Sequence, residues 1–121
     1  MQSFHYIILL SFRILKVLKV KYNLSVNCSL VLHGCYVYSR LIKEGFTKTA
    51  IMKFVTYFDY NKIIVYFNVL LKRGFIVDSG KTYAGRTLYN VSDQVTGIVK
   101  EIEESYNKEL YLFAEKYNIE L

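Results

Sequence analysis

The segment LKRGFIVDSGKTYAGRTLYNVSD, residues 71–93, decides the predicted fold of this 121-residue chain. Gly74 is expected to end the preceding helix, because glycine readily adopts the left-handed conformation that follows a helix C-terminus. Two short stretches rich in β-branched and aromatic residues follow, 75–80 and 86–92, and they are joined by a loop that contains Gly80 and Gly85. Short stretches of this kind around a glycine-containing loop predict a β-hairpin.

The loop of this hairpin carries basic and aromatic side chains. Lys81, Tyr83 and Arg86 fall at its tip. Cations at such a tip suit contact with the phosphate backbone of a nucleic acid. Solvated surface charge is the competing interpretation for these side chains.

The stretch before the hairpin has a helical pattern. Apolar residues recur at helical spacing over about 61–73, and either Asp59 or Asn61 can cap the N-terminus of that helix. Lys72 and Arg73 stand in its last turn, where cations complement the negative end of the helix dipole.

Three further helices are predicted beside the N-terminal one and the one at 61–73. Thr47 can cap a short helix that begins just after it, and Ser92 can cap a long final helix. Between the N-terminal helix and the short one, Asn27 or Ser29 is the candidate N-cap of a helix that Gly45 is expected to stop.

The predicted order is four helices, a hairpin and a long helix, in a single domain over residues 1–121. Two short helices joined by a tight turn and followed by a two-stranded hairpin are typical of a winged helix-turn-helix. We therefore expect a mainly α fold with a small β-hairpin wing. In that architecture the second short helix enters the major groove of double-stranded DNA, and the wing reaches toward the minor groove.

Charge is distributed unevenly along the chain. Residues 1–91 carry 13 Lys and Arg against three acids, a balance of +10, and residues 92–121 carry three Lys against seven acids, a balance of −4. A basic body of this kind suggests a surface that faces a polyanion. A charge excess that serves only solubility is the alternative.

The N-terminal helix, residues 4–22, is apolar over most of its circumference. Arg13, Lys16 and Lys19 share one narrow face. Positive charge follows the apolar run, and the run is far shorter than the ~20 residues of a membrane span, so neither a signal peptide nor a spanning helix is expected. Burial against a partner subunit is the favoured interpretation, and a helix lying on a membrane surface is the alternative.

The sequence contains no recognisable catalytic or metal-binding pattern. His5 and His33 have no Cys or Asp partner at ligand spacing, so we expect no enzyme, metal or cofactor. Cys28 and Cys35 lie seven residues apart in a predicted helix, roughly 10 Å, which is too far for a disulfide. Two buried, inert thiols in a reducing cytoplasm are expected, and a redox role for Cys28 is the alternative.

Residues 29–118 resemble the MarR family of bacterial winged-helix repressors. The resemblance is carried by TKTAIMKFVTYFDYNKIIVYFNVLLKRGFI and by the wing with LYNVSDQ. It implies a helix-turn-helix and wing over 29–91, and dimerisation helices over 1–22 and 92–121. It also implies a DNA-contacting wing arginine at Arg86, and a pocket for a small apolar effector between the dimer helices and the DNA-binding lobe.

The chain departs from the family pattern at two places. The acid of the family's Asp-x-Arg wing signature is replaced by Ala84, and Asp78 across the hairpin is the candidate to orient Arg86 instead. Two positions where the family favours Ser, Thr or Arg are Ile64 and Val65. Those two side chains offer a base edge only apolar contact, such as contact with a thymine methyl group.

The residues expected to contact DNA come from three segments, the two short helices and the wing. They are Lys48, Thr49, Asn61, Lys62, Val65, Asn68, Lys81, Tyr83 and Arg86. Ordinary helix capping is the competing interpretation for the first three, and solvated surface is the competing interpretation for Lys62, Asn68 and the three wing residues. We expect a homodimeric, sequence-specific transcriptional regulator with half-sites about one helical turn apart. A winged helix that binds another protein, as an interaction module or an accessory factor of a mobile element or of replication, is the alternative.

Overall fold

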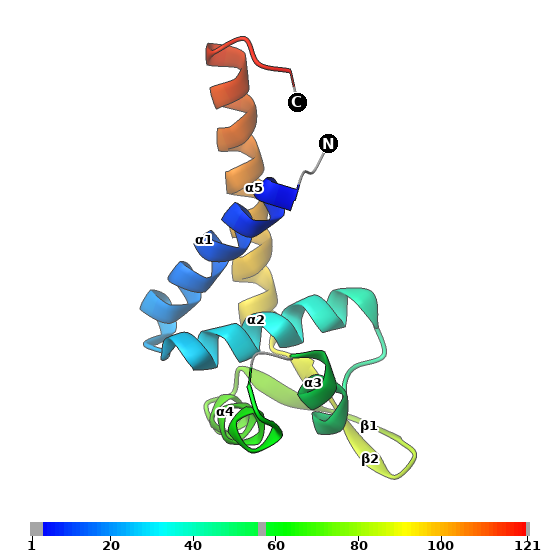
Figure 1. Cartoon of the computed structure of the whole chain (residues 1–121). Coiled ribbons are helices and arrows are strands. Elements are labelled where there is room, and N and C mark those ends of the chain that lie inside the picture. The colour runs from blue at the N-terminus through cyan, green and yellow to red at the C-terminus, as the bar shows by residue number, and fades with distance from the viewer. Residues whose placement is uncertain (1–3, 56–57, 121) are drawn as a thin grey trace.

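A computed structural model of the chain, which describes residues 4–55 and 58–120, contains five helices and one hairpin in the predicted order (Figure 1). The helices are α1 (Phe4–Tyr22), α2 (Val26–Leu41), α3 (Lys48–Phe54), α4 (Tyr60–Lys72) and α5 (Asp93–Lys116). The strands are β1 (Ile76–Tyr83) and β2 (Arg86–Val91), which pair antiparallel. The prediction of a mainly helical chain with a small hairpin is confirmed.

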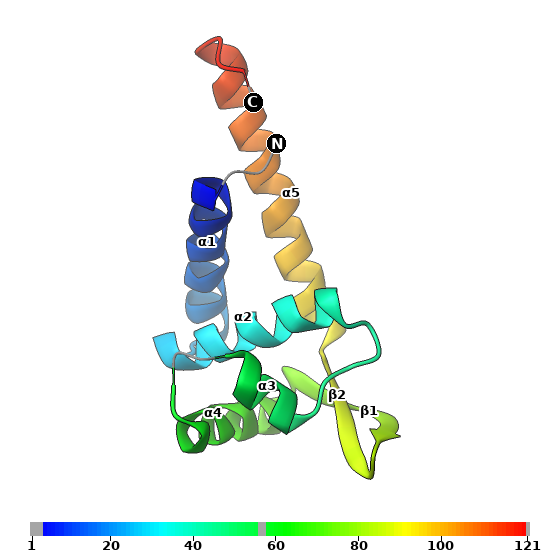
Figure 2. The ribbon, with the colours of Figure 1, turned by 45° about the vertical axis from the view of Figure 1, so that its right-hand side comes forward.

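The elements are arranged on the two sides of α2. Helices α1 and α5 project from one side of it, and the last turns of α5 extend beyond the start of α1 (Figures 1 and 2). Helices α3 and α4 and the hairpin lie on the other side. The three segments expected to contact DNA are therefore gathered at one end, away from the projecting parts of α1 and α5.

Side-chain caps fix the starts of α3 and α5. Thr47 Oγ1 accepts a hydrogen bond from the Ala50 amide at 3.1 Å, and Ser92 Oγ accepts one from the Val95 amide at 3.3 Å. Both predicted caps are confirmed. Asp59 is the N-cap residue of α4, although its side chain accepts no capping hydrogen bond from the described residues.

The predicted N-cap of α2 is wrong. Ser25 caps this helix, with its Oγ accepting from the Cys28 amide at 3.1 Å. Asn27 and Ser29 lie inside the first turn instead. The Ser29 hydroxyl donates to the Ser25 carbonyl at 2.9 Å, and the Asn27 amide group donates to the Tyr66 hydroxyl at 2.9 Å. These partners satisfy the two polar side chains within the helix, so the polar run does not interrupt it.

The predicted end of α2 at Gly45 is also wrong, because the helix ends at Leu41. Gly45 has φ of +109°, and a Cβ there would lie 3.0 Å from the Tyr89 carbonyl oxygen. This close approach allows Phe46 to exchange two backbone hydrogen bonds with Tyr89, of 2.9 and 2.7 Å. Gly45 therefore does not end α2. It is needed because only glycine allows the chain to approach β2 closely enough for these hydrogen bonds.

The hairpin has a shorter loop than expected. Ala84 and Gly85 both have positive φ, +51° and +76°, which is the backbone of a two-residue hairpin turn that matches strand twist. Lys81 and Tyr83 consequently lie in β1. The register shifts between Asp78 and Thr82, so a bulge in β1 separates a stem next to the body from the tip.

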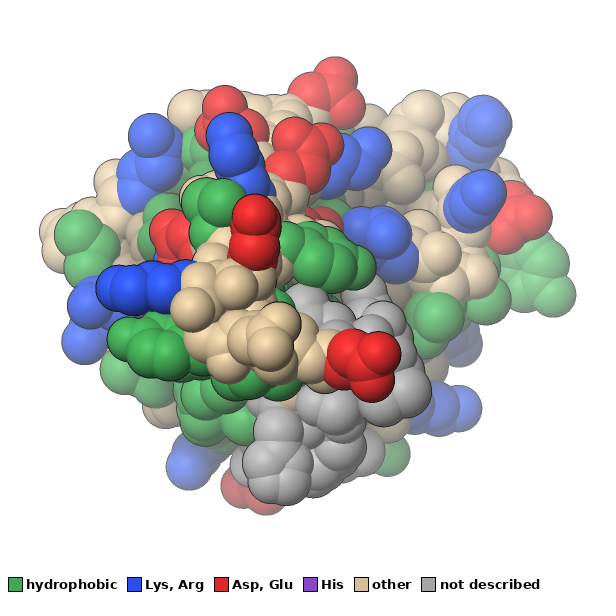
Figure 3. Space-filling view, turned by 90° about the horizontal axis from the view of Figure 1, so that it is seen from above, with side chains coloured by type: hydrophobic (Ala, Val, Ile, Leu, Met, Phe, Trp, Pro, Cys, Tyr) green, Lys and Arg blue, Asp and Glu red, His purple; other side chains and the backbone are tan. Residues whose placement is uncertain are grey.

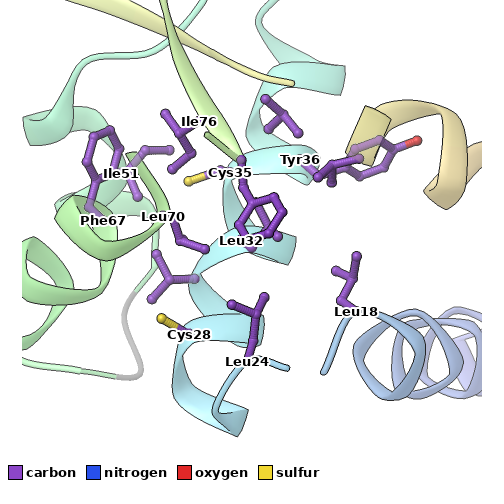
Figure 4. Close-up of a cluster of buried hydrophobic side chains, with 14 of the residues drawn as sticks. Leu18, Leu24, Cys28, Leu32, Cys35, Tyr36, Ile51, Phe67, Leu70 and Ile76 are labelled. Carbon is purple, nitrogen blue, oxygen red and sulfur yellow. The ribbon is translucent and has the colours of Figure 1, made fainter. Parts of the chain in front are cut away.

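The core is built around α2, which packs against α1, α3, α4 and β2 (Figure 4). Leu32 and Cys35 of α2 are fully buried, and Phe67 and Leu70 of α4 lie against the same cluster. Burial of each large apolar side chain contributes about 1.5–3 kcal/mol. A Cβ on Gly34 would lie 2.5 Å from a methyl group of Val55, so this glycine lets the end of α3 approach α2 closely.

Polar contacts attach α5 to α1 and α2. Arg13 on α1 forms a 2.8 Å ion pair with Glu109, and the Tyr6 hydroxyl donates to Asn107. Tyr36 on α2 is buried and donates its hydroxyl to Glu103 at 2.7 Å. Helix α5 is thereby attached along its first two thirds.

Apolar side chains remain exposed on the two projecting helices. Phe12 on α1 is 64 % exposed and Phe113 on α5 is 55 % exposed. Figure 3 looks onto this end of the molecule, where hydrophobic side chains reach the surface between charged ones. No helix in the described ranges is both long and apolar enough to cross a membrane.

Candidate nucleic-acid interface

Helix α4 has one buried and one exposed face. Ile63, Phe67 and Leu70 fix its inner face in the core. The spacing of these residues turns the intervening positions outward, because a helix repeats every 3.6 residues. The exposed positions include the predicted contact residues Asn61, Lys62, Val65 and Asn68. All four predicted contact positions on this helix are thus on the solvent-facing side.

Asn61 does not act as the N-cap, since Asp59 occupies that position. Asn61 lies in the first turn of α4 with its side chain exposed. The capping interpretation of Asn61 is therefore wrong, and the side chain is accessible to a ligand. Lys62 beside it is also exposed.

Arg86 links the hairpin to α3. Its Nη1 donates a 2.7 Å hydrogen bond to Thr49 Oγ1, across 37 residues of sequence. This contact joins two of the three predicted segments directly. Arg86 is exposed while making it, and Thr49 is half-buried, so the remaining donors of the guanidinium can still meet an anion.

Asp78 does not take the expected place beside Arg86. Its Oδ1 accepts a 2.8 Å hydrogen bond from the Gly80 amide, within the bulge of β1. In the register, Asp78 stands opposite Tyr89, whereas Arg86 stands opposite Tyr83 at the tip. Within residues 4–55 and 58–120, Arg86 forms no ion pair with Asp78, so the predicted replacement for the family's acid is wrong.

The other two predicted wing residues are exposed. Tyr83 is 71 % exposed at the end of β1, and Lys81 lies in the bulge, where its amide donates to the Ser79 hydroxyl at 3.2 Å. A bulge changes the direction in which strand side chains point. Lys81 is thus placed by local backbone geometry that the sequence pattern did not indicate.

Lys48 is the least accessible of the predicted cations. It is half-buried, and its ammonium lies 5.8 Å from the centre of the Phe67 ring. A cation over an aromatic face is attracted to it, by about 0.5–1 kcal/mol at exposed sites. Part of the role of Lys48 is therefore to cover the aromatic core between α3 and α4.

A groove of about 680 Å³ lies between α3 and the hairpin tip. Its lining combines three aromatic side chains with two cations: Tyr38, Phe54, Tyr83, Lys53 and Arg86. Sequence reasoning missed Lys53. It is exposed and stands one helical turn after Thr49, so the spacing i, i+4 would have placed it on the same side of α3.

A second groove, of about 430 Å³, lies between α1, α2 and the end of α3. Its lining is mostly apolar and includes Ile8, Phe12 and Leu15 of α1. His33 is also in the lining, and burial lowers the pKa of its imidazole, although the nearby Glu103 acts in the opposite direction. The groove is continuous with the exposed apolar surface of α1.

The two cysteines are buried and free. Burial raises the pKa of the Cys35 thiol strongly, and it also raises the pKa of the Cys28 thiol, against smaller opposing effects of Ser25 and Arg73. A raised pKa leaves little reactive thiolate at neutral pH. These environments favour the inert interpretation over a redox role for Cys28.

Comparison of the chain with protein-family models, curated proteins and solved structures finds no match. Among the described residues, no group of three His, Cys, Asp or Glu side chains could hold a metal ion. The functional proposal therefore depends on the position, exposure and charge of α3, α4 and the hairpin.

Proposed function

We propose that the protein is a homodimeric winged helix-turn-helix regulator that binds double-stranded DNA, as the resemblance to the MarR family implies. One observation carries the proposal: Arg86 of the hairpin reaches Thr49 of α3 at the end of the molecule where α4 also exposes its outer face. Recognition helix, preceding helix and wing are the three parts with which a winged helix holds DNA.

The charge of this end supports a polyanionic partner. Residues 46–91 contain seven Lys and Arg against two acids. Most of the phosphate contacts of a DNA-binding protein come from such side chains. Lys62, Lys81 and Arg86 are exposed and would supply them, with Lys53 as an additional contact.

The outer face of α4 would supply base contacts. Asn68 has the donor and acceptor needed for an adenine edge, and Val65, 58 % exposed, would pack against a thymine methyl group. At these two positions the helix would favour A·T pairs over G·C pairs, because neither side chain can form the bidentate contact that Arg makes with guanine.

The projecting helices support a homodimer. An isolated subunit leaves Phe12, Phe113 and Tyr117 more than half exposed, although large aromatic side chains are usually buried. A two-fold axis near α1 and α5 would cover these side chains and place two copies of α4 on the same side. The groove beside α1 would then lie between dimer helices and DNA-binding lobe, where a small apolar effector is expected.

A second candidate function is a protein-interaction module. The exposed Val65 and Val69 give α4 an apolar strip that suits another protein as well as it suits DNA. In that case α4 would bind the apolar surface of a partner, and the cations around it would lie at the rim.

The test is binding to random-sequence duplex DNA across a range of salt concentrations. About six phosphate contacts per dimer predict a log–log slope near −5 for the wild type. Arg86→Ala should shallow the slope by about one unit for each protomer. Lys108→Ala on α5 removes the same charge far from the proposed DNA-binding surface and should leave the slope unchanged, provided that the variant has the oligomeric state of the wild type, which is measured by sedimentation.

The two candidate functions give different results. Equal slopes for Arg86→Ala and Lys108→Ala would exclude the wing from DNA contact. An absence of binding at low salt by a correctly folded wild type would refute the DNA proposal and favour the interaction module. Folding of each variant is checked by its thermal unfolding.

A further inference from the structure

We propose that Arg73 is a positioning residue that fixes the direction of α4 relative to α1, and thereby sets the distance between the two α4 helices of a dimer. The consequence for DNA rests on the proposed function, whereas the contacts of Arg73 within one subunit do not. Sequence reasoning assigned Arg73 only to the C-terminus of its own helix.

The guanidinium of Arg73 caps a different helix. Its Nη2 donates to the Tyr22 carbonyl at 2.5 Å, and its Nη1 donates to the Asn23 carbonyl at 3.4 Å. Tyr22 is the last residue of α1, where backbone carbonyls have no partner within their helix. Arg73 therefore joins the C-terminal ends of α1 and α4, which are 51 residues apart in sequence.

Phe75 extends this junction to the hairpin and to α5. The rings of Tyr22 and Phe75 lie 4.6 Å apart, and the Arg73 guanidinium lies 5.1 Å from the Phe75 ring. The Phe75 amide donates to the Leu70 carbonyl of α4, and its carbonyl accepts from the amide of Ser92, the N-cap of α5. Four elements, α1, α4, β1 and α5, consequently meet at one place.

Arginine is the side chain that this geometry requires. Its planar fork can donate to two adjacent carbonyls at once, while a lysine ammonium acts as a single point charge. Its positive charge also complements the negative end of the α1 dipole. Because Arg73 is exposed, these contacts add little to the stability of the fold. Their proposed role is to hold the C-terminal end of α4 in one orientation relative to α1.

A small change of direction matters over the length of α4. The helix has 13 residues and is about 20 Å long at about 1.5 Å per residue. A rotation of about 10° at its C-terminus would displace its N-terminus by about 3.5 Å, which equals the rise of about one base pair. A displacement of this size would be large enough to change the preferred half-site spacing by about one base pair.

The test compares Arg73→Gln with Lys72→Gln, an exposed neighbour that lacks the contacts to α1. The first readout is the distance between spin labels on Lys16→Cys in α1 and Asn68→Cys in α4, measured within one subunit after dilution with unlabelled protein. It requires neither DNA nor a dimer, and both native cysteines are buried. We expect Arg73→Gln to broaden the distance distribution at least twofold, Arg73→Lys to broaden it less, and Lys72→Gln to leave it unchanged.

The second readout is the spacing between half-sites in DNA selected from a random oligonucleotide pool. Wild type and Lys72→Gln should select one spacing, and Arg73→Gln should accept spacings that differ by one base pair. An unchanged distance distribution in Arg73→Gln would overturn the proposal, whatever the DNA result. A broadened distribution with a single selected spacing would overturn the link to spacing. If the wild type binds no DNA, the proposed function and that link both fail, while the label distances still decide whether Arg73 positions α4.

Discussion

Substitution of Gly34 by alanine should strain the contact between α2 and α3. The added Cβ would lie 2.5 Å from Val55 Cγ2, well inside van der Waals contact. Val55 is 2 % exposed at the end of α3, and its branched side chain has few alternative rotamers. The clash therefore has to be relieved by a shift of one helix end against the other.

The size of the effect follows from two opposing contributions. Alanine favours a helix over glycine by about 1 kcal/mol, and overpacking of a core costs about 1–3 kcal/mol. Gly34→Ala should therefore lower the free energy of unfolding by up to about 2 kcal/mol. For 121 residues, an unfolding entropy of about 2.1 cal/mol/K per residue converts this to a fall in Tm of up to about 8 °C.

The assay is urea unfolding at one fixed protein concentration, followed by circular dichroism. Gly97→Ala on α5 is the matched control, because among the described residues an added Cβ there meets no atom within 4 Å. It should raise the free energy of unfolding by about 1 kcal/mol. In the Val55→Ala background, Gly34→Ala should also become stabilising, which gives a coupling energy of about 1–3 kcal/mol. If Gly34→Ala stabilises the wild type as much as Gly97→Ala does, the close approach of the two helices is refuted.

Three further predictions concern buried or half-buried groups. Burial lowers the pKa of His33 below its ordinary 6.5, so the free energy of unfolding should be fully maintained above about pH 6.5 and should fall as the pH decreases toward the folded-state pKa. His33→Asn should flatten that part of the pH profile, measured by urea unfolding, and an unaltered profile would contradict the prediction. The Tyr22 hydroxyl is buried without a hydrogen-bond partner among the described residues, so Tyr22→Phe should leave the free energy of unfolding unchanged or raise it by about 1 kcal/mol, and a clear loss would mean that the hydroxyl is bonded. Cys28 and Cys35 should react with a thiol reagent only as fast as the protein unfolds, and fast labelling of the native protein would show that burial does not protect them.

The order of elements was predictable because its signals are local. The hydroxyls of Thr47 and Ser92 each cap an amide three residues away, and Gly74 has the positive φ that follows a helix. Signals of this kind depend only on residues that are close in sequence, so they can be recognised from the sequence alone. The start of α2 was mispredicted because Asn27, a typical cap residue, instead finds a partner on α4.

The contacts of the candidate interface were less predictable, because they join residues that are distant in sequence. Exposure of Lys62 and Val65 follows from helical spacing. The hydrogen bond from Arg86 to Thr49, and the one from Arg73 to the end of α1, depend on how separate elements pack. The periodic pattern of apolar residues predicts which face of a helix is buried, but it does not predict such contacts between distant elements. The two-residue turn at Ala84 was hidden for another reason, since alanine rarely has a positive φ.

The division of the hairpin into two parts has a mechanical consequence. Two backbone hydrogen bonds between Phe46 and Tyr89 hold the stem to the segment that precedes α3. The stem is therefore fixed relative to the N-terminus of α3. Beyond the bulge, two residue pairs, Thr82 with Thr87 and Tyr83 with Arg86, form the tip. The bulge interrupts the regular pairing between stem and tip, so the inclination of the tip depends on its own contact with α3, the hydrogen bond from Arg86 to Thr49.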